Sequence, residues 1–215
     1  MNVQPAGRND GDGEVLGCES GRATFVLTKT AVTSMYSLIK PDGRTISEFL
    51  IRRAAEGFNY PDVGQTAGWM PEGYDHHQVR IELGCGDAVF HKATQALRNW
   101  QQFQVGWVAA IPNTTALQVG ETIAIRARLA GLWNLSACRI VEVFGDERAD
   151  TRFGFAMGTL PDHPEQGEER FMIEILPDGR VIYRVRAFFR PNTIAMRIAW
   201  PFFRRLFNRF RHESA

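Results

Sequence analysis

The chain has 215 residues, 44% of them hydrophobic and 23% charged, and a formal net charge of +1, so we expect one domain with a sizeable core and an extension. The sequence has no run of about 18 apolar residues, which excludes a membrane-spanning helix, and its first residues lack the apolar stretch of a secretory signal. Near-neutral charge argues against a general nucleic-acid binder. The 3 widely spaced cysteines suit neither a disulfide framework nor a metal site. We therefore expect a soluble cytoplasmic protein.

The N-terminal part of the chain carries few structural signals. Residues 1–20 are rich in Gly, Asn, Asp and Glu, and they lack apolar periodicity, so we expect a disordered tail. Residues 21–59 are interpreted as an N-terminal extension, in which the β-branched segment 23–39 is compatible with a strand or with a short helix. A turn signal at 40–44 precedes a short amphipathic helix over 46–56.

The next segments alternate between irregular and regular structure. Residues 57–75 are rich in Gly and Pro and are expected to be irregular. Alternating apolar and charged residues predict a strand over 78–83. An apolar stripe at helical spacing predicts a helix over 88–104, with Asp87 as its N-cap and Gly106 as its stop.

From Trp107 onward the hydrophobic pattern changes to period two. It predicts strands at 107–111, 120–129, 132–144, 151–159, 168–176 and 180–190. The short connections favour antiparallel pairing of neighbours, as in a meander. A helix over 192–211 ends the chain, with Pro191 at its start and Pro201 inside it, where we expect a kink.

This order of elements predicts an α+β, helix-grip architecture: a curved antiparallel sheet of about seven strands packed on a long C-terminal helix. A strongly curved sheet that is closed by one helix tends to enclose a cavity. A cavity smaller than a few hundred Å3 has no room for a drug-sized ligand. The volume of this cavity therefore separates ligand binding and catalysis from a membrane or scaffold role.

Several motifs carry a resemblance to a known family. They are Tyr60-Pro61-x-x-Gly64-x-Thr66, a helix with Phe90, Ala93, Ala96-Leu97 and Trp100, the segment Ala137-Cys138-Arg139-Ile140-Val141, and the block Gly158-Thr159-Leu160-x-x-His163-Pro164-x-x-Gly167-Glu168-Glu169-x-Phe171. With these motifs, residues 60–215 resemble DUF1990, a family of uncharacterised function. The family is similar to the helix-grip, START-like superfamily, which mostly binds apolar small molecules under the long helix and includes some enzymes. The resemblance implies such a fold and supplies no catalytic residue.

Alternation along two predicted strands places charged side chains on apolar faces. Arg139 shares a face with Val143, and Glu169 shares one with Phe171. Because an unpaired buried charge costs several kcal/mol, we expect these two charges to pair, with Tyr183 of the next strand beside them. The cluster is interpreted either as a ligand-orienting or catalytic site, in which Arg139 would favour a carboxylate or phosphate head group, or as a structural ion pair.

Other polar residues have a functional and a structural interpretation. His163 lies in a turn and suits acid–base chemistry, with Glu168 available to orient it, or it simply bonds the loop backbone. No GxSxG motif accompanies it, so a hydrolase triad has no support. Cys138, expected on the face away from the cluster, is interpreted as a small buried hydrophobe. The adjacent histidines at 76–77 lack metal-ligand spacing, so we expect no metal and no cofactor.

Three functions are compatible with these patterns. The first is binding of a small hydrophobic or amphipathic ligand between the sheet and the C-terminal helix, with Arg139, Glu169, Tyr183 and His163 as ligand-binding residues. The second is an enzyme of cyclase or hydrolase type that uses His163 or Glu169 in the same cavity. The third is a peripheral membrane or scaffold protein acting through the basic, aromatic helix 192–211, although packing of this helix on the sheet explains the same pattern. No nucleic-acid partner is expected.

Overall fold

The computed structural model describes residues 36–129, 131–146 and 151–214, without the side chains of residues 195, 207–208 and 211–212. Residues 34–215 form one compact unit, and the architecture below is that of this unit. The predictions for residues 1–20, and most of the segment 23–39, lie outside the described residues.

Helices occur at both ends of the unit and after its first long strand. They are α1 (Gly43–Ala54), α2 (Asp87–Arg98) and α3 (Ile194–Glu213), with two 3-10 turns, η1 (Gln65–Ala67) and η2 (Gln101–Phe103). The strands are β1 (Tyr36–Ser37), β2 (Asp75–Cys85), β3 (Val108–Ile111), β4 (Thr122–Leu129), β5 (Leu132–Phe144), β6 (Arg152–Thr159), β7 (Glu165–Ile175) and β8 (Arg180–Pro191).

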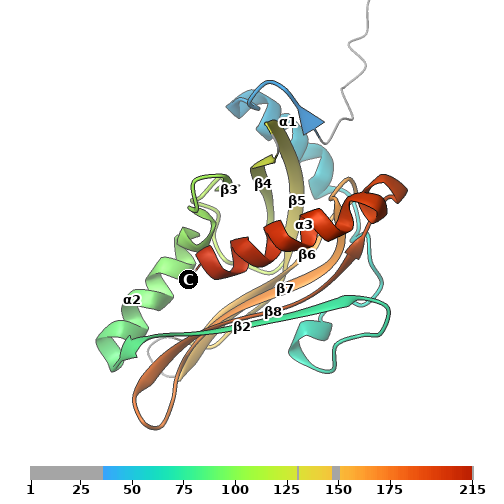
Figure 1. Cartoon of the computed structure of the whole chain (residues 1–215). Coiled ribbons are helices and arrows are strands. Elements are labelled where there is room, and N and C mark those ends of the chain that lie inside the picture. Colours follow the sequence, from blue (N-terminus) through green and yellow to red (C-terminus); the bar gives the residue numbers. More distant parts are fainter. Residues whose placement is uncertain (1–35, 130, 147–150, 215) are drawn as a thin grey trace, which may run out of the picture. The chain divides into compact units, whose positions relative to one another are not determined.

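All of these strands form one antiparallel sheet, which curves around α3 (Figure 1). The strand order is β2-β8-β7-β6-β5-β4-β3, and the short β1 pairs with β5. From β3 to β8 each strand pairs with the next one in sequence, as short connections require. The predicted α+β helix-grip fold is therefore confirmed, and β2 closes the far edge by pairing with β8.

The two faces of the sheet pack against different parts of the chain. The inner face, defined as the one that α2 and α3 cover, carries the largest hydrophobic core, with Phe155 and Phe171 at its centre and Phe210 of α3 against it. The outer face carries a smaller core under α1, where Ile46 and Phe49 pack on β4 and β5. The apolar side chains that alternate along each strand therefore fill the space under α2 and α3.

The predicted helix over 88–104 is shorter in the structure, because Trp100 interrupts it. Trp100 has a left-handed backbone conformation, with φ of 56°, which a helix cannot contain. Its indole is fully buried and donates a hydrogen bond to the carbonyl oxygen of Thr115 at 2.8 Å. Burial of this large side chain against Phe155 therefore outweighs the local helical pattern.

Candidate functional site

A cavity lies on the inner face of the sheet, between strands β4 to β8 and the C-terminal part of α3. Its apolar wall includes Phe103, Ile125, Leu129, Met157 and Phe210, and its polar wall includes Asn134, Ser136, Thr159, His163, Glu165 and Glu169. The cavity has a volume of about 70 Å3. It is therefore well below the few hundred Å3 that a drug-sized ligand occupies, and it suits a short molecule with one polar end.

His163 lines this cavity and lies in the turn between β6 and β7. Its ring is buried, and Nδ1 accepts a hydrogen bond from the backbone N–H of Glu165 at 3.1 Å. The neutral ring therefore carries its proton on Nε2. Burial lowers the pKa of His163 to about 4, so the ring is neutral at pH 7. His163 therefore acts as a hydrogen-bonding turn residue and not as an acid.

The buried His163 predicts a loss of stability in mild acid. Its pKa is lowered from 6.5 to about 4 by folding, so the unfolded chain binds the proton more tightly than the folded protein. The stabilisation that comes from this pKa difference is present above pH 6.5 and is lost as the pH falls towards 4. Between pH 7 and pH 5 the free energy of unfolding is expected to fall by about 2 kcal/mol. Urea unfolding at several pH values measures this slope, and His163→Asn is expected to flatten it. An equal slope in both proteins contradicts the assignment.

Glu169 and Tyr183 lie on the inner face, as predicted from alternation, and both side chains are buried. Glu169 lines the cavity, whereas Tyr183 lines a neighbouring hollow beneath α2. The Tyr183 hydroxyl shares a hydrogen bond of 3.1 Å with the hydroxyl of Ser214, at the end of α3. Burial, followed by the nearby charge of Glu169, raises the pKa of Tyr183. Tyr183 therefore fastens the end of the covering helix beside the cavity.

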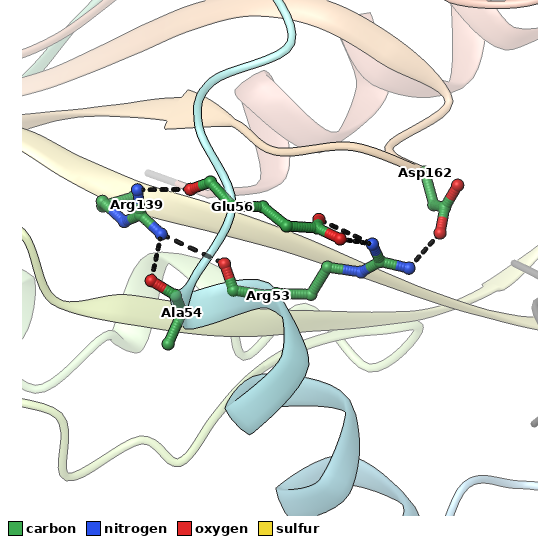
Figure 2. A network of polar contacts seen from close by, with 5 residues as sticks. All are labelled: Arg53, Ala54, Glu56, Arg139 and Asp162. Atoms are coloured by element: carbon green, nitrogen blue, oxygen red, sulfur yellow. Dashed lines mark hydrogen bonds and ion pairs between the residues drawn. The ribbon is translucent and has the colours of Figure 1, made fainter.

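Arg139 does not belong to this site, and its predicted pairing with Glu169 is wrong. Figure 2 shows its guanidinium on the outer face, where it donates hydrogen bonds to three carbonyl oxygens at the end of α1. The acceptors are Glu56 at 2.8 Å, Ala54 at 3.0 Å and Arg53 at 3.1 Å. Arg139 thus binds the unsatisfied carbonyl groups and the negative end of that helix.

A β-bulge explains the incorrect orientation. The register of β5 against β6 shifts between Ile140 and Glu142, so β5 contains one extra residue there. Strict alternation places Arg139 on the same face as Val143, but the bulge reverses the parity between them. Val143 therefore packs on the inner core while Arg139 points outward.

Cys138 takes the inward position that alternation had given to its neighbour. Its side chain is buried and lines the cavity, and burial raises the pKa of its thiol, as do the charges of Glu169 and Glu165. A thiol that holds its proton so tightly is a poor nucleophile. The structure thus agrees with the interpretation of Cys138 as a small buried side chain, but not with its predicted face.

The sequence prediction missed a second polar cluster, on the outer face. The side chain of Glu168 is completely buried and accepts hydrogen bonds from the Tyr60 hydroxyl at 2.9 Å, from the backbone N–H of Gly64 at 2.6 Å and from that of Thr66 at 3.0 Å. The Thr66 hydroxyl is a fourth donor to it. Glu168 therefore holds the loop before β2 and does not orient His163.

This cluster joins the two most specific motifs of the sequence. Tyr60, Gly64 and Thr66 come from the first motif, and Glu168 comes from the last one. Gly158 pairs with Glu168 across the β6–β7 ladder, and a Cβ on Gly158 would collide with the Tyr60 hydroxyl. Alternation along β7 places Glu168 on the face opposite Glu169, and its contacts with residues 60–66 depend on long-range folding that local periodicity does not show.

Helix α3 presents two different faces. Met196, Phe203, Leu206 and Phe210 pack towards the sheet, as expected of a covering helix. Phe202, by contrast, is 58% exposed. The arginines at 197, 204, 205 and 209 are exposed as well. The solvent-exposed side of α3 is therefore basic, with apolar side chains among the arginines.

The described part of the chain holds neither a metal-binding cluster nor a membrane-spanning helix. Within residues 36–129, 131–146 and 151–214, no group of three or more His, Cys, Asp and Glu side chains is placed to hold a metal ion. His76 instead forms a 2.7 Å hydrogen bond with the carbonyl oxygen of Pro71. None of the described helices is long and apolar enough to cross a membrane.

Comparison with known proteins identifies relatives along most of the chain. A family described as "Domain of unknown function (DUF1990)" matches residues 59–215. A UPF0548 protein of Dictyostelium discoideum is 32% identical over 84% of this chain and 92% of its own length. A UPF0548 protein of Deinococcus radiodurans is 30% identical over 78% of this chain and 88% of its own length.

Solved structures with a partial likeness to this chain include a START superfamily protein and a major latex-like protein. A START superfamily protein from Mycobacterium smegmatis has a TM-score of 0.37 and 11% identity, over 63% of this chain and 93% of that one. A major latex-like protein from Panax ginseng has a TM-score of 0.36 and 11% identity, over 65% of this chain and 92% of that one.

Proposed function

Since the chain belongs to the DUF1990 family, whose description assigns no activity, we propose from its geometry that it binds a short amphipathic molecule in the cavity under α3. The observation that carries this proposal is a cavity that is lined mainly by apolar side chains and also by the buried side chains of Glu169, Glu165 and His163. The apolar wall favours a hydrocarbon group, and the polar wall fixes its orientation.

The polar wall sets the chemistry of the head group. Glu165 and Glu169 are buried carboxyl residues, and the neutral His163 presents an N–H on Nε2. Because Arg139 lies on the other face, it cannot meet the anionic head group expected from the sequence. A hydroxyl group, which donates a hydrogen bond to a carboxylate and carries no charge, fits this wall better than a carboxylate.

The polar wall supports ligand binding better than it supports catalysis. An acid–base pair for chemistry at neutral pH needs groups whose pKa values lie near 7, whereas the pKa of His163 is about 4 and that of Cys138 is raised. An enzyme in this cavity would depend on Glu169 as its acid or base, and this remains the second candidate.

A matched pair of six-carbon probes tests the proposed head-group preference. We expect 1-hexanol to bind the full-length protein with a Kd in the low millimolar range, because a cavity of about 70 Å3 takes up only part of its chain and each buried CH2 contributes about 0.8 kcal/mol. Hexanoate is expected to bind at least tenfold more weakly, because its carboxylate would lie beside Glu169. Isothermal titration calorimetry at pH 7 measures both affinities.

The variant Glu169→Gln provides the control for this experiment. It keeps the shape of the side chain and removes the charge, so the difference between hexanol and hexanoate is expected to shrink to less than threefold. Native mass spectrometry of the purified protein complements the titration by detecting any small molecule that copurifies. If neither probe binds, or if hexanoate binds better than hexanol, the proposed site is wrong.

A further inference from the structure

A second hollow lies on the outer face of the sheet, away from the cavity under α3. It has a volume of about 600 Å3, extends over β2, β8, β7 and β6, and has η1 as one wall. Five arginines line it, at positions 80, 152, 170, 184 and 186. On β8, Arg184 and Arg186 alternate with Tyr183 and Val185, which pack in the inner core, so alternation places these two arginines on the outer face.

The sheet register places these arginines opposite one another. Arg80 of β2 is the direct partner of Arg184 on β8, and Arg186 of β8 is the direct partner of Arg170 on β7. Like charges at directly opposite positions of an antiparallel pair destabilise the sheet. Two such pairs on three adjacent strands therefore concentrate positive charge on this part of the outer face.

Carboxylates neutralise only part of this charge. Arg170 pairs with Glu142 at 2.6 Å, and Arg184 pairs with Glu174 at 2.9 Å. Among the described residues, Arg80 and Arg152 make no ion pair, and both are exposed. The hollow thus holds three more positive groups than these two carboxylates balance, although the formal charge of the whole chain is +1.

Part of this arginine set is held in place before any ligand arrives. Arg186 donates to the carbonyl oxygens of Gly68 at 2.7 Å and Thr66 at 3.2 Å, which also fastens η1 as the wall of the hollow. The guanidinium of Arg170 stacks over the ring of Phe144, with 3.9 Å to its centre. Guanidinium groups fixed in this way lose little entropy when they bind an anion.

We propose that this hollow binds a soluble small molecule that carries two or more phosphate groups. Guanidinium groups form bidentate hydrogen bonds with phosphate oxygens, and the arginines lie on four strands, β2, β8, β7 and β6, so the hollow offers contacts to more than one phosphate. The volume lies within the range of small-molecule sites. The three unbalanced positive groups match the charge of a polyphosphate.

Inorganic tripolyphosphate is the probe for this proposal. We expect the full-length protein to bind it in calorimetry at about 50 mM salt, with an affinity that falls as the salt concentration rises. Arg80→Gln is expected to weaken binding about tenfold, because it removes an exposed guanidinium that makes no ion pair among the described residues. Arg52→Gln is the matched control, since Arg52 is exposed on α1 and changes the net charge equally; it is expected to change the affinity by less than twofold.

Thermal stability gives a second readout that a general loss of structure does not mimic. Without ligand at low salt, Arg80→Gln is expected to raise Tm by about 1 °C, because it relieves the repulsion from Arg184. Absence of tripolyphosphate binding to the wild-type protein overturns the proposal, as does equal weakening by Arg80→Gln and Arg52→Gln. Binding to phosphoinositide vesicles without binding to tripolyphosphate also overturns it and supports a membrane surface instead.

Discussion

Replacing Glu168 by glutamine is expected to lower the free energy of unfolding by about 4 kcal/mol. The carboxylate is completely buried and accepts from Tyr60, from Gly64 and twice from Thr66. A glutamine amide has one oxygen acceptor, and its NH2 group faces donors, so about two of the four donors lose their acceptor. Each buried donor left without a partner costs about 1–3 kcal/mol.

Urea unfolding monitored by tryptophan fluorescence measures this effect. Glu174→Gln is the matched control, since Glu174 lies on the same face of β7 but pairs with Arg184 near the surface at 2.9 Å, where an ion pair contributes about 0–1 kcal/mol. A cost below about 1 kcal/mol for both variants would mean that the loop before β2 does not depend on Glu168.

The same cluster shows why the loop at residues 57–74 is ordered despite its Gly and Pro content. Tyr60 packs edge-to-face on Phe188 of β8, with 5.9 Å between ring centres, while its hydroxyl reaches Glu168. A second aromatic residue of the loop, Tyr74, packs on Phe188 at 4.9 Å. The irregular backbone is thus held by side-chain contacts, and η1 becomes a fixed wall of the arginine hollow.

Local patterns predicted the order of the elements because each predicted strand has one apolar face. The boundaries of β5 and the meander from β3 to β8 follow directly from period-two alternation and short turns. Alternation also placed Glu169 on the inner face, because no irregularity separates it from Phe171 and Ile173.

The site was harder to predict, because the errors in placing its residues come from structural features that sequence periodicity does not contain. The bulge in β5 adds one residue between Ile140 and Glu142 and reverses the face of Arg139 relative to Val143. The burial of Glu168 depends on a loop more than 100 residues away in sequence, which covers a position that alternation assigns to solvent. Both are long-range or backbone effects, and both determine which charges face the cavity.

Arg139→Met is expected to lower the free energy of unfolding by about 3 kcal/mol and to leave 1-hexanol binding within twofold of the wild type. The guanidinium donates hydrogen bonds to three carbonyl oxygens at the end of α1 (Figure 2). It also donates one to the Thr122 hydroxyl. In a half-buried position that water still reaches, each of these hydrogen bonds contributes only about 0.5–1 kcal/mol net. The positive charge at a helix C-terminus adds about 0.3–1 kcal/mol, so the whole comes to about 3 kcal/mol.

Two further substitutions separate the geometry from the charge. Arg139→Lys keeps the charge but not the planar fork that reaches several carbonyl groups, so we expect it to recover only about half of the lost stability. Arg184→Met removes a half-exposed arginine from the same face and is expected to cost less than about 1 kcal/mol, because its partner is the surface carboxylate Glu174. These costs are measured by urea unfolding.

Hydrogen exchange locates the effect of Arg139→Met in the structure. Exchange is expected to rise in α1, whose anchors on the sheet are Ile46, Phe49 and this cap, and to stay unchanged in β7, where Glu169 lines the cavity. A variant with wild-type stability and no hexanol binding would instead place Arg139 in the cavity. Because the guanidinium and the cavity lie on opposite faces of β5, stability and binding are expected to change independently at this residue.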